Sequence, residues 1–184
     1  MIQARIISAF LFLFVISCVS AASKTGTETI QGLGKRKQEI LNNGGGVYDL
    51  AIAMLETTDL NTDYVYGDGK TGDSANFGIF KQNWLMLRTS SSQFKQYSKD
   101  DSNQGAVLNK NLAQDIKARQ ESQKFYGPDK WFAGHRNGES GLSNPYTQDI
   151  TDYKNGVNWI YSQLTKDKKY LSDDTRFWIY VVPI

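Results

Sequence analysis

Apolar residues recur with helical spacing in two segments of the chain. Between residues 47 and 56 they fall at i, i+3, i+4, i+7 and i+8, on one face of a helix: Val47, Leu50, Ala51, Met54 and Leu55. A stronger stripe runs from Ile150 to Leu164, with Thr147 or Asp149 as its N-terminal cap. Both segments are therefore predicted to be helices, and Glu56 stands at the end of the first.

The remaining segments carry weaker patterns. Shorter helices are predicted at residues 35–41, 82–88 and 105–119. Two β-prone runs, 64–66 and 76–80, flank a glycine-rich connection and predict a small hairpin. Three further segments are interpreted as a loose lead-in, a structured loop and a closing strand, in that order: 22–29, 131–138 and 176–182. The predicted fold is α+β, mainly helical with a small antiparallel hairpin.

The first 21 residues have the layout of a secretory signal peptide. Arg5 precedes an apolar run over residues 6–16, and small residues lead to a cleavage site after Ala21. The run is shorter than the roughly 20 apolar residues of a membrane span, and no basic cluster follows it. We expect a secreted, extracellular protein without a membrane anchor, in which residues 22–184 form a single catalytic domain.

Composition narrows the chemistry of the mature chain. Cleavage would remove Cys18, the only cysteine, and with it any disulfide, thiol nucleophile or cysteine metal site. Removing Arg5 from 21 basic residues leaves 20 against 19 acidic ones, without the basic stripe typical of nucleic-acid binding. His135 is the only histidine, which excludes sites that need more than one. We expect no metal, no cofactor and no nucleic-acid partner.

Two carboxylates have contrasting surroundings. Glu56 follows apolar residues at a helix end, where burial and the negative end of the helix dipole favour the protonated acid. Asp68 lies in a glycine-flanked turn, where water and backbone amides favour the ionised form. Hydrolysis of a glycosidic bond needs such a pair, one carboxyl protonated and one ionised. Glu56 suits the general acid and Asp68 the base, with Asp73 as the alternative base.

The block from Glu56 to Trp84 resembles glycoside hydrolase family 134, within the lysozyme-like superfamily. The similarity rests on Glu56-Thr57-Thr58, on Tyr64-Val65-Tyr66-Gly67-Asp68-Gly69-Lys70 and on Asn76-Phe77-Gly78-Ile79-Phe80-Lys81-Gln82-Asn83-Trp84. The resemblance implies a lysozyme-like fold and a secreted endo-β-1,4-mannanase that inverts the anomeric centre. It also implies a Glu acid and an Asp base about a dozen residues later, positions that Glu56 and Asp68 fill.

Candidate substrate contacts come from the same block and from one later segment. Mannan is neutral and rich in hydroxyl groups, so its site should combine amide and hydroxyl partners with a few aromatic faces. The substrate-binding candidates are Tyr66, Asn76, Lys81, Gln82, His135 and Arg136. For the first four, a role in bracing the hairpin fits the sequence equally well.

Two other functions remain open from the sequence. A lysozyme-like or chitinase-like hydrolase of N-acetylated glycans would share the fold, because a fold does not fix a substrate. A non-catalytic carbohydrate-binding protein would be expected to lack one of the two carboxylates, whereas both are present. A monomer is the expected state of a small secreted hydrolase that acts on a polymer.

Overall fold

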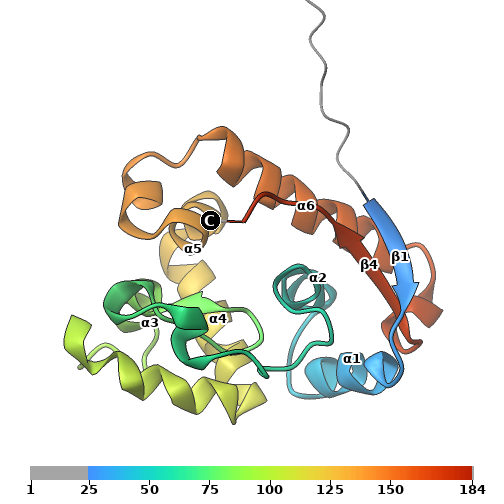
Figure 1. Cartoon of the computed structure of the whole chain (residues 1–184), viewed down its shortest axis with the longest axis horizontal. Coiled ribbons are helices and arrows are strands. Elements are labelled where there is room, and N and C mark those ends of the chain that lie inside the picture. Colours follow the sequence, from blue (N-terminus) through green and yellow to red (C-terminus); the bar gives the residue numbers. More distant parts are fainter. Residues whose placement is uncertain (1–24, 184) are drawn as a thin grey trace, which may run out of the picture.

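The structure, a computed structural model, describes residues 25–183 and is mainly helical with two small antiparallel sheets (Figure 1). The helices are α1 Leu33–Asn42, α2 Val47–Glu56, α3 Trp84–Ser90, α4 Leu112–Tyr126, α5 Pro128–Ser143 and α6 Gln148–Leu164. Shorter 3₁₀ segments are Tyr66–Gly69, Gly72–Ser74, Lys99–Asn109 and Lys168–Leu171. The strands are β1 Thr25–Thr29, β2 Asn76–Phe77, β3 Gln82–Asn83 and β4 Thr175–Ile179. The predicted mainly helical α+β class is confirmed.

The predicted signal peptide, residues 1–21, lies outside the described residues. Within residues 25–183, no helix combines the length and apolar character needed to cross a membrane.

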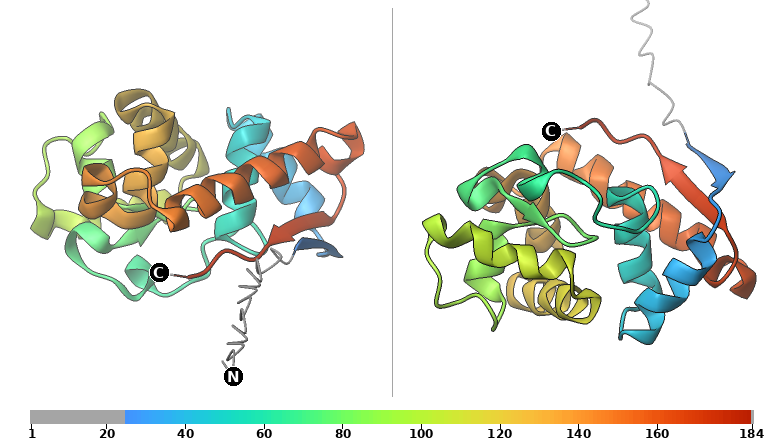
Figure 2. Two further views of the ribbon diagram at one scale, coloured as in Figure 1. Left: turned by 90° about the horizontal axis from the view of Figure 1, so that it is seen from above. Right: turned by 60° about the horizontal axis from the view of Figure 1, so that its bottom comes forward.

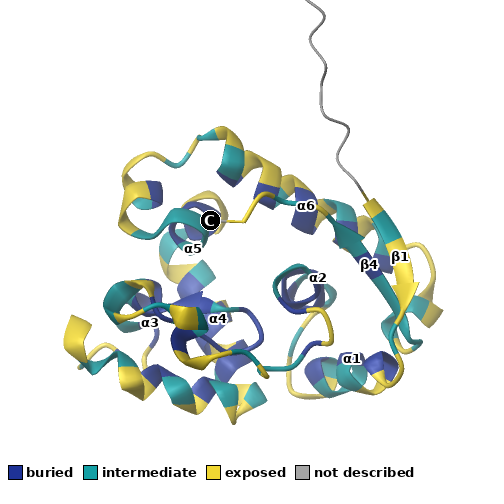
Figure 3. Cartoon of the chain, in the orientation of Figure 1, coloured by how far each residue is buried: buried dark blue, intermediate teal, exposed yellow. Residues whose placement is uncertain are grey.

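Helix α2 lies at the centre of the molecule, with α1, α5, α6 and β4 around it (Figure 1). The sequence predicted one apolar face, but the residues from Leu50 to Met54 are all 0% exposed. Figure 3 shows this helix as mostly buried. Ile52 and Ala53, off the predicted face, are covered as well, because a helix that is apolar all round is buried on every side. Glu56 is the last residue of this central helix.

A second, smaller apolar cluster lies beneath the hairpin and α3. It contains Ala75, Phe77, Trp84, Leu87, Phe94, Leu108 and Ala118, contributed by β2, α3, α4 and the segments between them. The Trp84 ring meets the edges of Phe77 and Phe94, with ring centroids 6.5 and 5.4 Å apart. Trp84 is therefore a core residue.

Strand β1 corrects the prediction of a loose lead-in at residues 22–29. It pairs with β4 in antiparallel register from Thr25 opposite Ile179 to Thr29 opposite Thr175. Four of its five residues are exposed, so the segment has no alternation of apolar and polar residues to reveal it. Its partner lies about 150 residues away, and only the tertiary fold brings the two together.

The small hairpin forms between different residues from those predicted. Residues 66–69 make a 3₁₀ turn, and β2 pairs instead with β3 through the tight turn from Gly78 to Lys81. Gly78 has a positive φ of 76°, and a side chain there would overlap the Asp115 carboxylate. A contact with α4 therefore decides where the hairpin turns.

Two further predictions were wrong. Residues 131–137 are helical within α5 rather than a loop, because Trp131, Phe132 and Ala133 pack into the main core, and the helix is kinked at Gly138. The helix predicted at 105–119 is divided, with a 3₁₀ segment ending at Asn109 and α4 starting at Leu112. Asn111 caps α4 by accepting a hydrogen bond from the backbone of Gln114 at 3.1 Å.

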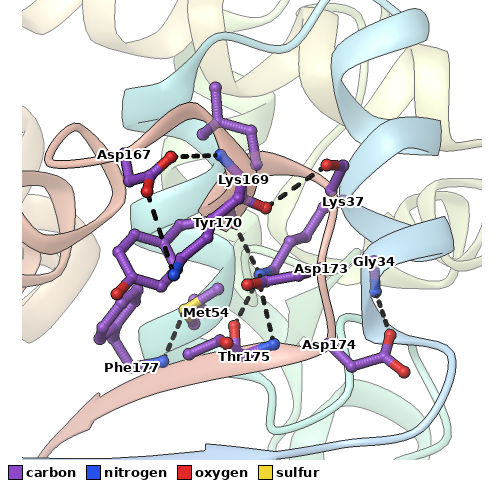
Figure 4. Close-up of polar contacts among 12 residues, drawn as sticks. Gly34, Lys37, Met54, Asp167, Lys169, Tyr170, Asp173, Asp174, Thr175 and Phe177 are labelled. Atoms are coloured by element: carbon purple, nitrogen blue, oxygen red, sulfur yellow. Dashed lines mark hydrogen bonds and ion pairs between the residues drawn. The ribbon is translucent and has the colours of Figure 1, made fainter.

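Buried Lys37 fastens the C-terminal segment to α1 (Figure 4). Its ammonium donates to the carbonyl oxygens of Tyr170 and Thr175, at 2.7 and 2.6 Å, and to Asp173 at 3.3 Å. Burial lowers the pKa of Lys37, and the Asp173 carboxylate opposes that shift. Beyond β4 the chain continues past α6 and reaches α5 (Figures 1 and 2). Lys37 thus sets the position from which this last segment starts.

Candidate active site

A polar cleft of about 690 Å³ is lined by residues from the turns and hairpin of residues 68–83 and from helices α5 and α6. One wall comes from the turns and hairpin of residues 68–83 together with Leu85 and Lys99. The opposite wall comes from α5 residues 135–140, Tyr153 of α6 and Pro183. Glu56 and Asp68 both line this cleft, so the fold brings the two predicted catalytic carboxylates to one space.

Glu56 reaches the cleft from the C-terminal end of α2, and its side chain is 16% exposed. Its Oε1 atom accepts a hydrogen bond from the Tyr153 hydroxyl and lies 3.1 Å from His135 Nε2. Among the described residues no hydrogen bond involves Oε2, which leaves that oxygen for a ligand in the cleft. The sequence indicated apolar surroundings for Glu56, whereas the structure supplies two polar partners.

Tyr153 and His135 are themselves held by aromatic packing. The His135 ring stacks on Trp131 with centroids 4.7 Å apart and an angle of 7°, and Phe132 meets Tyr153 edge-on at 5.9 Å. Burial raises the pKa of Tyr153 well above its usual value, and the Glu56 carboxylate raises it further. The Tyr153 hydroxyl therefore keeps its proton and remains a donor to Glu56.

Sequence reasoning missed Tyr153 as a site residue. The residue belongs to the apolar stripe from Ile150 to Leu164, which identified it only as part of a buried helix face. It is 3% exposed, as that stripe predicts. No local signal shows that its hydroxyl meets Glu56, because α2 and α6 are 97 residues apart at this contact.

Asp68 also lines the cleft, and its backbone has a left-handed conformation. Its φ of 59° and ψ of 34° are left-handed, and both flanking residues, Gly67 and Gly69, also have positive φ. Lys81 donates to Oδ1 at 3.0 Å and Asn76 donates to Oδ2 at 3.4 Å. A lysine and an amide thus hold the carboxylate, which remains 25% exposed at the cleft.

Asp73, the alternative base, is engaged elsewhere in the same wall. Arg88 donates to its two carboxylate oxygens at 2.7 and 2.8 Å, a bidentate pair. This hydrogen bond raises the pKa of Arg88. Asp73 lines the cleft, but both of its oxygens already have a charged partner.

The structure divides the predicted substrate-binding residues into two groups. Asn76, Lys81, His135 and Arg136 line the cleft. Tyr66 and Gln82 are outside its lining. Tyr66 is exposed and packs edge-on against Phe77, whereas Gln82 is buried and donates to the Asp115 carboxylate at 2.7 Å.

Asp115 fixes the hairpin from beneath. Its carboxylate accepts hydrogen bonds from the Ile79 backbone and the Gln82 side chain, both at 2.7 Å. Asn109 holds the start of the same turn by accepting from the backbone of Gly78 at 2.7 Å. These bonds set the position of Lys81, and through it the position of Asp68.

The geometry therefore offers two carboxylates that line one polar cleft, each with its own set of partners. Within residues 25–183, no group of three or more His, Cys, Asp or Glu side chains is arranged to hold a metal ion. Such a pair can protonate a leaving group from one side and activate water from the other.

A family model described as glycosyl hydrolase family 134 matches residues 34–181. That range contains Glu56, Asp68 and all the cleft residues except Pro183. A search among curated proteins finds no match.

Asp115 predicts a pH dependence of stability. Burial raises its pKa to about 8, although hydrogen bonds from Gln82 and the backbone oppose the shift. An unfolded aspartate has a pKa of about 3.9, so the contribution of Asp115 to stability is full below pH 4 and is lost as pH rises through 8. Relative to Asp115→Asn, the unfolding free energy of the unmodified protein should fall by up to about 1.4 kcal/mol per pH unit in that window.

Urea unfolding of both proteins between pH 4 and 9 measures this difference. Asp100→Asn, at an exposed position, is the matched control and should follow the unmodified protein. Parallel curves for the unmodified protein and Asp115→Asn would contradict the prediction.

Proposed function

Since the chain belongs to glycosyl hydrolase family 134 and is a glycoside hydrolase, we propose that it is a secreted endo-β-1,4-mannanase that inverts the anomeric centre. The observation that carries the proposal is the placement of Glu56 and Asp68 on one cleft with different partners. Polymeric β-1,4-mannan is the substrate, and the chain acts as a monomer without a cofactor.

Glu56 is the general acid and Asp68 the general base. Asp68 takes a proton from a water molecule as the water oxygen attacks the anomeric carbon. Glu56 gives its proton to the glycosidic oxygen as the bond to the leaving sugar breaks. Attack and departure occur on opposite faces of the sugar ring, so the β-linkage yields an α-configured product.

The surroundings of each carboxyl group support these roles. The Tyr153 hydroxyl holds Oε1 of Glu56, so Oε2 is the oxygen that carries the transferred proton. Lys81 and Asn76 each donate to one oxygen of Asp68, which orients the carboxylate at the cleft.

The cleft suits a neutral, hydroxyl-rich chain. Its lining includes three asparagines and three lysines, groups that exchange hydrogen bonds with sugar hydroxyls: Asn76, Asn83, Asn137, Lys70, Lys81 and Lys99. Its openness at the surface fits cleavage within a long polymer, because the chain can enter from the side.

A substrate panel tests the proposal. Residues 22–184 are incubated with linear mannan, chitin and bacterial cell walls, and shortened chains are detected by chromatography. Mannan alone should be cleaved, and proton NMR should show the α-anomer first. Cleavage of chitin or cell walls without cleavage of mannan would favour the N-acetylated glycan reading, and an initial β-anomer would exclude inversion.

Substitution of the acidic residues separates their roles. Glu56→Gln and Asp68→Asn should each lower kcat by about 10³-fold or more with folding unchanged, because each loses its proton-transfer step. Asp73→Asn is the matched control and should retain at least a tenth of the activity, since Asp73 is paired with Arg88. An active Asp68→Asn together with an inactive Asp73→Asn would show that the base is Asp73.

Tyr153→Phe tests the residue that holds Glu56. Losing the hydroxyl should lower kcat about tenfold, equivalent to one hydrogen bond of roughly 1.4 kcal/mol, with KM unchanged. Tyr48→Phe, which loses only a surface bond to Asn158, is the control. An unaltered kcat for Tyr153→Phe would show that Tyr153 is only a packing residue.

A further inference from the structure

The segment after β4 continues the strand pattern beyond the sheet and approaches the cleft. Ile179 and Val181 pack against the main core, whereas Tyr180 and Val182 are 59% and 63% exposed. Gly156 of α6 gives Val181 its place, because a Cβ added there would lie only 3.1 Å from the Val181 side chain. The segment is thus seated on α6 rather than projecting into solvent.

Arg136 provides a second anchor. Its guanidinium donates to the carbonyl oxygen of Val182, and its side chain is only 9% exposed. The same group lies over the Tyr153 ring at 5.7 Å, with Nε 4.0 Å from Asp149. Arg136 therefore holds Val182 close to Tyr153, the residue that donates to Glu56.

These two anchors place Pro183 in the lining of the cleft, together with Glu56 and Tyr153. Most other lining residues are charged or polar, and Leu85 is the other aliphatic side chain among them. A pyranose ring has hydroxyl groups at its edge and C–H groups on its faces, so a polar cleft satisfies the edge and leaves the faces without partners. Pro183 supplies an apolar surface against which a C–H face of the sugar ring can pack.

We propose that Pro183 is a substrate-contacting residue, which packs against the face of a hexose unit on the α5 side of Glu56 and is held there by Arg136. The proposal rests on the proposed function, since it assigns part of a sugar-binding site to the same cleft. Val182 and Pro183 follow the residues 34–181 that the family model matches, so the contact comes from outside the matched range.

Pro183→Ser tests the proposal in the full chain. Removing the ring should raise KM for mannohexaose about three- to tenfold with kcat within twofold, because an apolar contact outside the proton-transfer groups is lost. The set of product lengths from mannohexaose should also shift, since weakening one position of the cleft changes the preferred register of the bound chain. Thermal stability should stay the same, because Pro183 is exposed.

Val182→Ser is the matched control. It removes an exposed apolar side chain from the same segment, outside the cleft lining, and keeps the carbonyl that Arg136 binds. It should leave KM and the product lengths unchanged. Equal KM values and product lengths for Pro183→Ser and the unmodified protein would overturn the inference. A fall in kcat together with lower thermal stability would also overturn it, because that result indicates a structural role.

The readout also separates this inference from the proposed function. Binding of mannohexaose and chitohexaose is measured by calorimetry with Glu56→Gln alone and with Glu56→Gln combined with Pro183→Ser. If chitohexaose binds and mannohexaose does not, the proposed substrate is wrong, and the effect of Pro183→Ser on chitohexaose still decides the role of the proline. Equal binding by both variants, or binding of neither sugar, overturns the inference.

Discussion

Burial of the central part of α2, from Asp49 to Met54, is the constraint on which the rest of the structure depends. These residues must be covered on every side, and α1, α5, α6 and β4 provide that cover. The same packing fixes Glu56, which ends the helix two residues later. The two partners of Glu56 come from α5 and α6, so the packing of the core and the position of the Glu56 carboxyl group belong to one arrangement.

The second carboxylate is controlled in a different way. Asp68 lies on a turn with three successive positive φ angles, a conformation that aspartate tolerates better than most residues and that the surrounding contacts support. Those contacts come from Lys81 and Asn76 on the hairpin, which in turn depends on Asp115 of α4. One carboxyl group is thus positioned by apolar packing and the other by a chain of polar contacts. The two carboxyl groups line one cleft but share none of these partners.

The C-terminal segment links the core of the molecule to the cleft. Lys37 donates to the carbonyl groups of Tyr170 and Thr175 and so fixes the start of β4 on α1. Gly156 and Arg136 then guide the following residues over α6 to the cleft. Lys37 and Arg136 therefore both position the C-terminal segment. They do so by side-chain hydrogen bonds to its carbonyl groups, because the segment after β4 has no strand partner among the described residues.

The sequence by itself determined the helices with strong apolar periodicity and the position of Glu56 at the end of one of them, and it selected Glu56 and Asp68 as candidates. These features are local, because helix spacing and turn-forming glycines act over a few residues. Only the tertiary structure decided the pairing of β1 with β4, the turn at Gly78, the helical state of residues 131–137 and the contact of Tyr153 with Glu56. Each of these depends on contacts with residues far away in the sequence. A local pattern of apolar and polar residues does not show which distant residues will be in contact.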